Sequence, residues 1–344
     1  GLVGSEMCIR DRTKNAQPMM KDQKLQHLAA TTCILLATVF SATTAAARGG
    51  DPEQQVALAD PFILYDKGTY YAYGTGSDNG IPVYVSKDLK NWSSPSGDNT
   101  VYLALDKRDS YGNKWFWAPE VYLIDGTYYM YYSAEEHICV ATSQSPLGPF
   151  RQKEKRPMIE GRNIDNSLFI DQNGQAYLFW SKIDTCNAIW VCELEKDLQT
   201  PRPETARLCI SMSQKWEKEW PSVNEGPFVI RHKNTYYLTY SANSYECPHY
   251  GIGYATADHP LGPWTKSEHN PILQSPGTLQ GCGHHAIFKD KRHRYRVVFH
   301  AHHAPGQISP RIMHLTRLKF IPQKNTADRL IFLPDYFTPQ LTRD

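Results

Sequence analysis

A turn followed by an aromatic-rich strand of the same pattern occurs five times along the chain. The copies are YDKGTYYAYGT (65–75), IDGTYYMYYSA (124–134), DQNGQAYLFWS (171–181), HKNTYYLTYSA (232–242) and KDKRHRYRVVFHA (289–301). One tyrosine marks each copy, at Tyr71, Tyr129, Tyr177, Tyr237 and Tyr295, so the markers are 58, 48, 60 and 58 residues apart. That spacing holds four short strands with period-two alternation, and repeated units of this kind predict a solenoid or a propeller. We therefore expect an all-β fold, a single-domain five-bladed β-propeller.

The N-terminal region does not follow this repeat. Residues 19–47 begin with a short lysine-bearing segment, continue through an apolar run and end in three alanines, the order typical of a secretory signal peptide. The apolar run is too short for a membrane anchor. Residues 1–18 match neither a signal nor a blade, and we expect them to be a non-native upstream segment. The predicted propeller domain is 48–344, in a secreted or periplasmic protein that leaves the membrane after signal cleavage.

Charge and cysteine content exclude several classes of partner. Formal net charge is +2, without the basic stripe that a nucleic-acid-binding surface requires. Six of the eight cysteines follow residue 47, and they show no CxxC pair and no zinc-ligand spacing. An exported protein can form disulfides, but their pairing cannot be deduced from sequence. For Cys139, Cys192 and Cys209, which lie in strand-like runs, we expect buried free thiols.

Three carboxylates stand at nearly the same place in three of the repeats. Asp60, Asp165 and Glu225 each precede the marker tyrosine of their blade by eleven or twelve residues. An Asp-Pro pair such as the one at Asp60 is an ordinary turn opener when it stands alone. Because the first strand of each propeller blade lines the central channel, however, three acids in one slot are expected to converge at one mouth of that channel.

Glycosidic-bond cleavage gives a chemical reason for such a set. One carboxylic acid must protonate the leaving oxygen, and a second carboxylate acts from the other side of the sugar. If the second group activates water, the two stand roughly 6.5–9.5 Å apart and configuration inverts, whereas a nucleophile stands about 5–5.5 Å away. A third carboxylate can keep the acid protonated near neutral pH by like-charge proximity.

These motifs together resemble the five-bladed β-propeller glycoside hydrolases of family 43. The resemblance is carried by ADPF (59–62), WAPE (117–120), IDNSLF (164–169), EGPF (225–228) and GCGHH (281–285), one per blade and in order. It implies that Asp60 is the general base, that Glu225 is the general acid, that Asp165 orients the acid and modulates its pKa, and that hydrolysis inverts configuration. Asn166 and Cys282 depart from the residues that are commoner at these places, which leaves the subgroup open.

Supporting residues follow from the same resemblance. Trp117 is expected to stack on a sugar face, with core packing as the alternative, and Arg311 to lie near the sugar, with a plain rim cation as the alternative. Glu120, one or two positions off the carboxylate slot, is expected to support substrate binding from the rim or from a second layer. His284 occupies the slot of blade five, and the resemblance implies that it binds substrate or a water-coordinated Ca2+, since imidazole is a poor calcium ligand. No cofactor is expected for the chemistry, and His300 is expected to be a packing or surface residue.

The leading hypothesis is an exported, exo-acting hydrolase of plant cell-wall side chains or oligosaccharides that releases arabinofuranose or xylose. An endo-acting arabinanase or xylanase of the same fold is the first alternative. A non-catalytic glycan-binding propeller is the second, because fold alone does not fix function; a protein-interaction propeller would lack the three acids. The stretches 91–115 and 195–219 are long enough to wall off a pocket, which favours exo action.

Overall fold

The computed structural model describes residues 54–97, 100–184, 186–219, 221 and 223–342. The predicted upstream segment 1–18 and signal peptide 19–47 lie outside these residues. The chain from Gly49 to Asp344 forms one compact unit. Among the described residues, no helix has the length and apolar character needed to cross a membrane.

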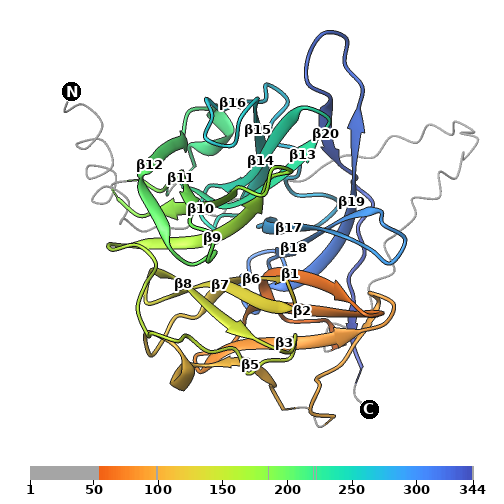
Figure 1. Ribbon diagram of the computed structural model, residues 1–344. Helices are drawn as coiled ribbons and strands as arrows, with labels where there is room; N and C mark the ends of the chain where they lie inside the picture. The colour runs from red at the N-terminus through yellow and green to blue at the C-terminus, as the bar shows by residue number, and fades with distance from the viewer. Residues whose placement is uncertain (1–53, 98–99, 185, 220, 222, 343–344) are drawn as a thin grey trace, which may run out of the picture. The chain divides into compact units, whose positions relative to one another are not determined.

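Five antiparallel sheets follow one another along the chain and form the five blades (Figure 1). Blade one contains β1 (Ala59–Asp66), β2 (Thr69–Thr75), β3 (Gly80–Ser86) and β5 (Leu103–Asp106). Blade two contains β6 (Trp117–Ile124), β7 (Thr127–Ala134) and β8 (His137–Ser143). Blade three contains β9 (Asn163–Ile170), β10 (Ala176–Lys182), β11 (Ala188–Leu194) and β12 (Pro201–Ile210). The predicted all-β five-bladed propeller is confirmed.

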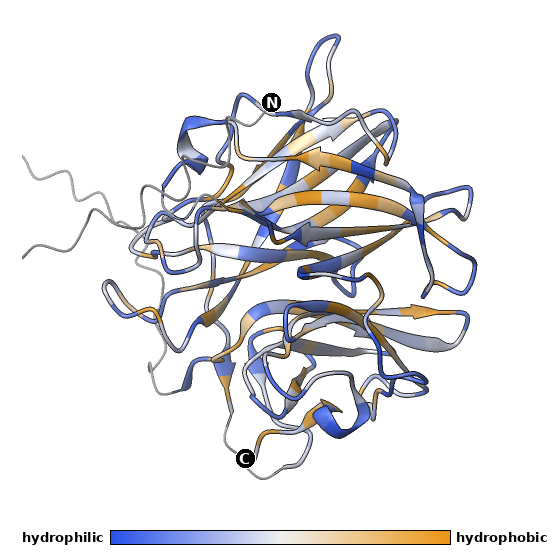
Figure 2. Ribbon diagram, turned by 90° about the vertical axis from the view of Figure 1, so that its left-hand side faces the viewer, coloured by the Kyte–Doolittle hydropathy of each residue, from blue (hydrophilic) through white to orange (hydrophobic). Residues whose placement is uncertain are grey.

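The last two blades follow the same order. Blade four contains β13 (Asn224–His232), β14 (Thr235–Ala242), β15 (Gly251–Ala257) and β16 (Thr265–Lys266). Blade five contains β17 (Gly283–Lys289), β18 (Tyr295–Ala301), β19 (Ile312–Ile321) and β20 (Arg329–Phe332). Apolar positions run along the strands while the connecting loops are mostly polar (Figure 2), as alternating strands packed face to face require.

Blade two has three strands, whereas the repeat spacing predicted four for each blade. In the segment after residue 149, where a fourth strand would lie, only a single bridge joins Arg151 to Thr142. The reason is that this segment shares its backbone hydrogen bonds with blade one: Phe150 N–H donates to Ala104 O at 2.8 Å, and Gln152 N–H donates to Asp109 O at 3.0 Å. The segment therefore lies across the junction of two blades.

Residues near both ends of the described chain connect blade five to blade one. Met313 N–H, in β19, donates to Val56 O at 3.0 Å, just before β1 begins. Near the C-terminus, β21 (Gln340–Leu341) pairs in parallel with β4 (Asn91–Trp92). Each terminal segment thus adds backbone hydrogen bonds to the junction at which the ring of blades closes.

The first strands of the blades form the inner ring. Each of β1, β6, β9, β13 and β17 contacts the next in cyclic order, and β17 contacts β1 (Figure 1). A bulge interrupts each of these strands near its start. The bulged residue has a positive φ in every blade: Asp60 (47°), Ala118 (47°), Asp165 (58°), Gly226 (55°) and His284 (43°). For residues other than glycine this conformation costs roughly 1–2 kcal/mol each; bulges of this kind re-aim side chains beside functional sites.

Hydrogen bonds between blades hold these bulges in place. At four of the five junctions, the bulged residue's N–H donates to a side chain at the end of the second strand of the neighbouring blade. These bonds are Ala118 to Thr75 (3.0 Å), Asp165 to Ser133 (2.9 Å), His284 to Ser241 (2.8 Å) and Asp60 to His300 (3.1 Å). Blade four differs: Ser181 donates to Asn224 O at 3.1 Å, and Gly226 N–H donates to Asp165 Oδ2 at 3.1 Å. The carboxylate of Asp165 thus takes the place of the usual hydroxyl.

Candidate active site

A cavity of about 210 Å³ lies where the bulged ends of the inner strands converge. It is lined by Asp60, Trp117, Ile164, Asp165, Glu225, Tyr245, His284 and Arg311. Six of the seven site residues predicted from the sequence are among them. The structure therefore brings together residues from all five blades that the sequence separates by up to 251 positions.

Asp60 is held as a carboxylate by cationic and hydrogen-bonding neighbours. Arg311 Nη1 donates to Asp60 Oδ1 at 2.8 Å, and His284 Nδ1 lies 3.5 Å from the same oxygen. Burial by itself raises the pKa of Asp60, but Arg311, His284 and His300 outweigh burial and lower it well below its usual value. An ionised carboxylate that faces the cavity is suited to accept a proton from water.

His300 was predicted to be a packing or surface histidine, and its position shows that this description is incomplete. Its side chain is fully buried, and its Nδ1 accepts the backbone N–H of Asp60. Burial, with the nearby Arg311, lowers the pKa of His300 to about 3, so the ring is neutral. His300 thereby fixes the strained backbone of Asp60. The signal that could have identified it is its place at the end of the second strand, where other blades have Thr or Ser.

Glu225 lies in β13 and is half-buried beside the same cavity. Burial raises its pKa to about 7; the charge of Asp60 adds to this shift, while a hydrogen bond from Tyr250 opposes it. That bond joins the Tyr250 hydroxyl to Glu225 Oε1 at 2.8 Å. The prediction that Glu225 shares the slot of Asp60 and Asp165 is wrong by one residue, since Gly226 carries the bulge of blade four.

Asp165 forms a coupled acid pair with Glu225. Burial, followed by the charges of Glu225 and Asp60, raises the pKa of Asp165 well above its usual value. Its Oδ2 accepts the N–H of Gly226, the residue after Glu225, and lies 3.9 Å from His284 Nδ1. Because both carboxyls have raised pKa values, the pair as a unit retains a proton near neutral pH.

Aromatic side chains form part of the wall and continue outside it. Trp117 lines the cavity and stacks on Trp115, with ring centroids 5.7 Å apart and planes 18° from parallel. Trp115 is 41% exposed. On another side, the guanidinium of Arg311 lies 4.6 Å from the ring centre of Tyr245. Indole faces of this kind suit the C–H faces of sugars.

Glu120, predicted to support substrate binding, does not line the cavity. Its carboxyl accepts hydrogen bonds from Tyr122 and Ser167 and from the backbone N–H of Leu168. Burial raises its pKa to about 8, so it is a protonated acid at neutral pH, and its charge when ionised raises the pKa of Asp165. Glu120 therefore influences the site through Asp165 and does not itself line the cavity.

The residues that enclose the cavity differ from the expected ones. None of the lining residues comes from 91–115 or 195–219, the stretches that were expected to wall off a pocket. The loop between β14 and β15 instead contributes Tyr245 to the wall, and it also carries Tyr250, which donates to Glu225. Sequence reasoning missed both tyrosines because nothing in the run SANSYECPHY (241–250) indicates that Tyr245 reaches the cavity or that Tyr250 donates to the carboxylate of Glu225.

The resemblance implied that His284 binds substrate or a water-coordinated Ca2+. Calcium requires six to eight oxygen ligands, whereas Nδ1 of His284 faces only Asp60 and Asp165. Among the described residues, these three side chains do not bring their ligand atoms close enough together to form a metal-binding group. These side chains do not supply the oxygen ligands of a directly bound calcium ion, and a water-coordinated ion at His284 stays a prediction.

The five-bladed propeller and the carboxyl groups of Asp60, Asp165 and Glu225 together define a propeller glycoside hydrolase. Comparison with known proteins gives the same class. The sequence model of glycosyl hydrolases family 43 matches residues 51–324, and the chain belongs to this family. It is a glycosidase. Among curated relatives it is 24% identical to a beta-D-galactofuranosidase of Aspergillus niger, over 76% of this chain and 79% of that protein. It is also 24% identical to an extracellular exo-alpha-(1->5)-L-arabinofuranosidase of Cellvibrio japonicus, over 73% and 80%.

Solved structures give a higher similarity. A crystal structure of an endo-1,4-beta-xylanase from Bacteroides thetaiotaomicron superimposes with a TM-score of 0.78 at 40% sequence identity. The match covers 84% of this chain and 98% of that one. The names of these relatives differ in sugar and in mode of action, so the family fixes the reaction type and leaves the substrate to be argued from the site.

Proposed function

We propose that the protein is an inverting, exo-acting glycosidase that removes arabinofuranose or xylose from plant cell-wall polysaccharide side chains or oligosaccharides. The observation that carries the proposal is the contrast between two acids facing one small cavity. Arg311 and the neighbouring histidines lower the pKa of Asp60, so this carboxyl is ionised. Burial raises the pKa of Glu225 to about 7, so this carboxyl keeps its proton at pH values below about 7. Two carboxyls with pKa values pushed apart are suited to the roles of base and acid.

The proposed reaction uses these groups in one displacement. Asp60 accepts a proton from a water molecule, whose oxygen attacks the anomeric carbon from one side of the sugar ring. The bond between that carbon and the leaving oxygen breaks, and Glu225 gives its proton to this oxygen. Asp165 holds the backbone beside Glu225 through Gly226 N–H and couples electrostatically to the acid. The product has inverted configuration.

The size of the cavity supports exo action on a small sugar. At about 210 Å³ it is smaller than the roughly 300–1,000 Å³ typical of sites for larger ligands. One terminal sugar unit fits such a volume better than an internal segment of a chain. Trp117 supplies an apolar face beside the acids, and Arg311 supplies donors for ring hydroxyl groups in addition to its ion pair with Asp60.

An endo-acting enzyme on xylan or arabinan is the second candidate. Trp115 stacks on Trp117 and is exposed outside the cavity, so a sugar chain has a surface along which to continue. The similar Bacteroides protein is named an endo-1,4-beta-xylanase. Export is proposed from the predicted signal segment and from relatives named extracellular.

A substrate panel followed by proton NMR tests the proposal. The panel contains aryl arabinofuranoside, aryl xyloside, aryl galactoside, arabinan and arabinoxylan. Release of a single pentose, seen first as the inverted anomer, supports the proposed function. Oligosaccharide products from the polymers support endo action, and a retained anomer contradicts the roles given to Asp60 and Glu225. Glycan binding without hydrolysis would support the non-catalytic alternative.

A further inference from the structure

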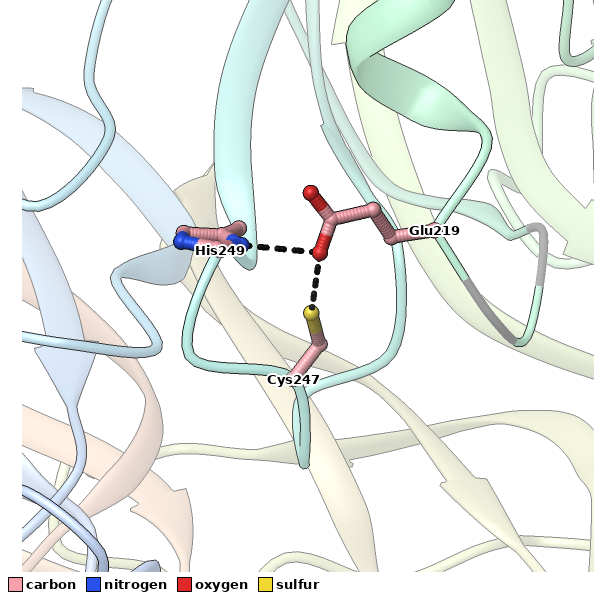
Figure 3. A group of neighbouring side chains, drawn as sticks. All are labelled: Glu219, Cys247 and His249. Carbon is pink, nitrogen blue, oxygen red and sulfur yellow. Dashed lines mark hydrogen bonds and ion pairs between the residues drawn. The ribbon is translucent and has the colours of Figure 1, made fainter. Parts of the chain in front are cut away.

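Three potential metal ligands converge beside the loop between β14 and β15, and none of them is among the residues that line the cavity. They are Glu219, from the segment that follows the short 3₁₀ turn η4 (Lys215–Glu217), and Cys247 and His249, from the loop between β14 and β15. Figure 3 shows their side chains pointing toward one another, with Glu219 in the middle. Glu219 Oε2 lies 2.8 Å from His249 Nδ1 and 3.3 Å from Cys247 Sγ, and all three ligand atoms lie within 4.8 Å of one another.

A buried asparagine fixes the backbone that carries two of these ligands. Asn243 is fully buried and has a φ of 71°. Its Oδ1 accepts the backbone N–H of Glu219 at 3.0 Å, and its Nδ2 donates to His249 O at 3.1 Å. One side chain thus connects the two segments and sets the spacing of the ligands before any ion binds.

The third ligand is positioned by consecutive turns. Cys247 N–H donates to Ser244 O at 2.8 Å, and Tyr250 N–H donates to Cys247 O at 3.0 Å. The thiol is half-buried, whereas the carboxylate and the imidazole are exposed. An ion from solvent can therefore reach the cluster.

We propose that Glu219, Cys247 and His249 form a binding site for a divalent transition-metal ion of the zinc type. One thiolate, one imidazole and one carboxylate are a ligand set that Zn2+ accepts, with a fourth, tetrahedral position left for water. Calcium and magnesium are excluded because they require oxygen ligands. Binding replaces the two hydrogen bonds to Glu219 with metal bonds and releases the thiol proton of Cys247 to solvent.

The site links metal binding to the wall of the cavity. The same loop carries Tyr245, which lines the cavity, and Tyr250, which donates to Glu225. An ion that joins this loop to Glu219 restricts the movement of both tyrosines. Restricting these tyrosines should change the rate of turnover. That consequence rests on the proposed function, whereas metal binding itself does not.

Cobalt titration tests the site without any substrate. Protein freed of metal by a chelator is titrated with cobalt chloride, and absorption from thiolate-to-cobalt charge transfer is recorded. The expected result is one equivalent bound with a thiolate band, which Zn2+ displaces. Cys247→Ser should abolish the band, and His249→Ala and Glu219→Gln should weaken affinity at least tenfold.

A matched control is His269→Ala, because His269 is also an exposed histidine beside a glutamate, Glu268, but has no thiol partner. This variant should bind cobalt like the unaltered protein. Circular dichroism of each variant without metal checks that the fold is retained. The proposal is overturned if no thiolate band forms, or if the band persists in Cys247→Ser, which would place the ion on another cysteine. Neither outcome depends on whether the protein hydrolyses any glycoside.

Discussion

Arg311 Nη1 lies 2.8 Å from Oδ1 of Asp60, although the two residues are 251 positions apart. Asp60 lies at the start of β1, and Arg311 immediately precedes β19 of blade five, so the contact forms only when the ring of blades closes. The side chain of Arg311 is largely buried, which leaves the ion pair less screened by water than a surface pair. The ionised state that a base requires therefore depends on ring closure.

Replacement of this arginine should move the acidic limb of the pH–rate profile. Arg311 lowers the pKa of Asp60, so in Arg311→Gln that pKa rises and the base is lost at a higher pH than in the unaltered enzyme. We expect kcat/KM at neutral pH to fall on the order of tenfold or more. The measurement is kcat/KM for an aryl glycoside as a function of pH. Arg311→Lys, which keeps the charge, should shift the limb less; an unmoved limb in Arg311→Gln would argue against Asp60 as the base.

Loss of the Tyr250 hydroxyl should move the alkaline limb in the same profile. The hydrogen bond from Tyr250 favours the ionised form of Glu225, so Tyr250→Phe raises the pKa of Glu225 above about 7. Because the general acid must be protonated, activity should persist to higher pH. Tyr254→Phe, in the neighbouring strand β15, serves as the control and should leave the limb in place. A limb that moves to lower pH would contradict the acid role.

The acid role of Glu225 also predicts a dependence on the leaving group. Glu225→Ala should lower kcat/KM by on the order of 10²–10⁴ for natural glycosides, whose leaving oxygen needs a proton. Activated aryl glycosides, which leave without protonation, should lose much less. Asp60→Ala should lower kcat/KM equally for natural and activated glycosides, while sugar binding is retained. Equal losses for both substrate classes in Glu225→Ala would exclude general-acid catalysis by this residue.

The stacked indoles predict a difference between chain substrates and small ones. Trp115 is exposed and lies beyond Trp117, outside the cavity. Trp115→Ala should raise KM for oligosaccharides by about tenfold, the loss expected for one aromatic stacking contact. KM for an aryl monoglycoside should stay unchanged. Leu208→Ala, at another exposed apolar residue, is the matched control. Equal effects on both substrates would show that Trp115 acts through the fold.

The raised pKa of Glu120 predicts how the free energy of unfolding depends on pH. Its pKa is about 8 in the folded protein and near 4.5 in the unfolded chain, so between these pH values unfolding releases a proton that the folded state retains. The free energy of unfolding should therefore fall as pH rises through this window, by on the order of a few kcal/mol. Urea unfolding at several pH values measures the slope. Glu120→Gln, which keeps the shape without the charge, should flatten it; an unchanged slope would mean that Glu120 is not the group responsible.

Much of the fold could be predicted because each blade repeats a local pattern. Alternating aromatic strands and short turns depend on neighbouring residues, so the five repeats and the positions of Asp60 and Asp165 could be predicted from the sequence. The register of each inner strand against its neighbour is harder to predict. Counting back from Tyr237 placed Glu225 in the common slot, whereas strand pairing gives that slot to Gly226. Turns that differ in length by one residue make the count ambiguous by the same amount.

The sequence by itself determined the number of blades, the three acids and the family. Only the tertiary structure decided which neighbours set the charge of those acids. His300 and Arg311 reach Asp60 through ring closure, and Tyr250 reaches Glu225 through a loop folded over the cavity. The convergence of Glu219 with Cys247 and His249 likewise depends on two segments held together by Asn243. Burial and distance between remote segments control pKa and ligand geometry, and neither quantity is encoded in any local stretch of residues.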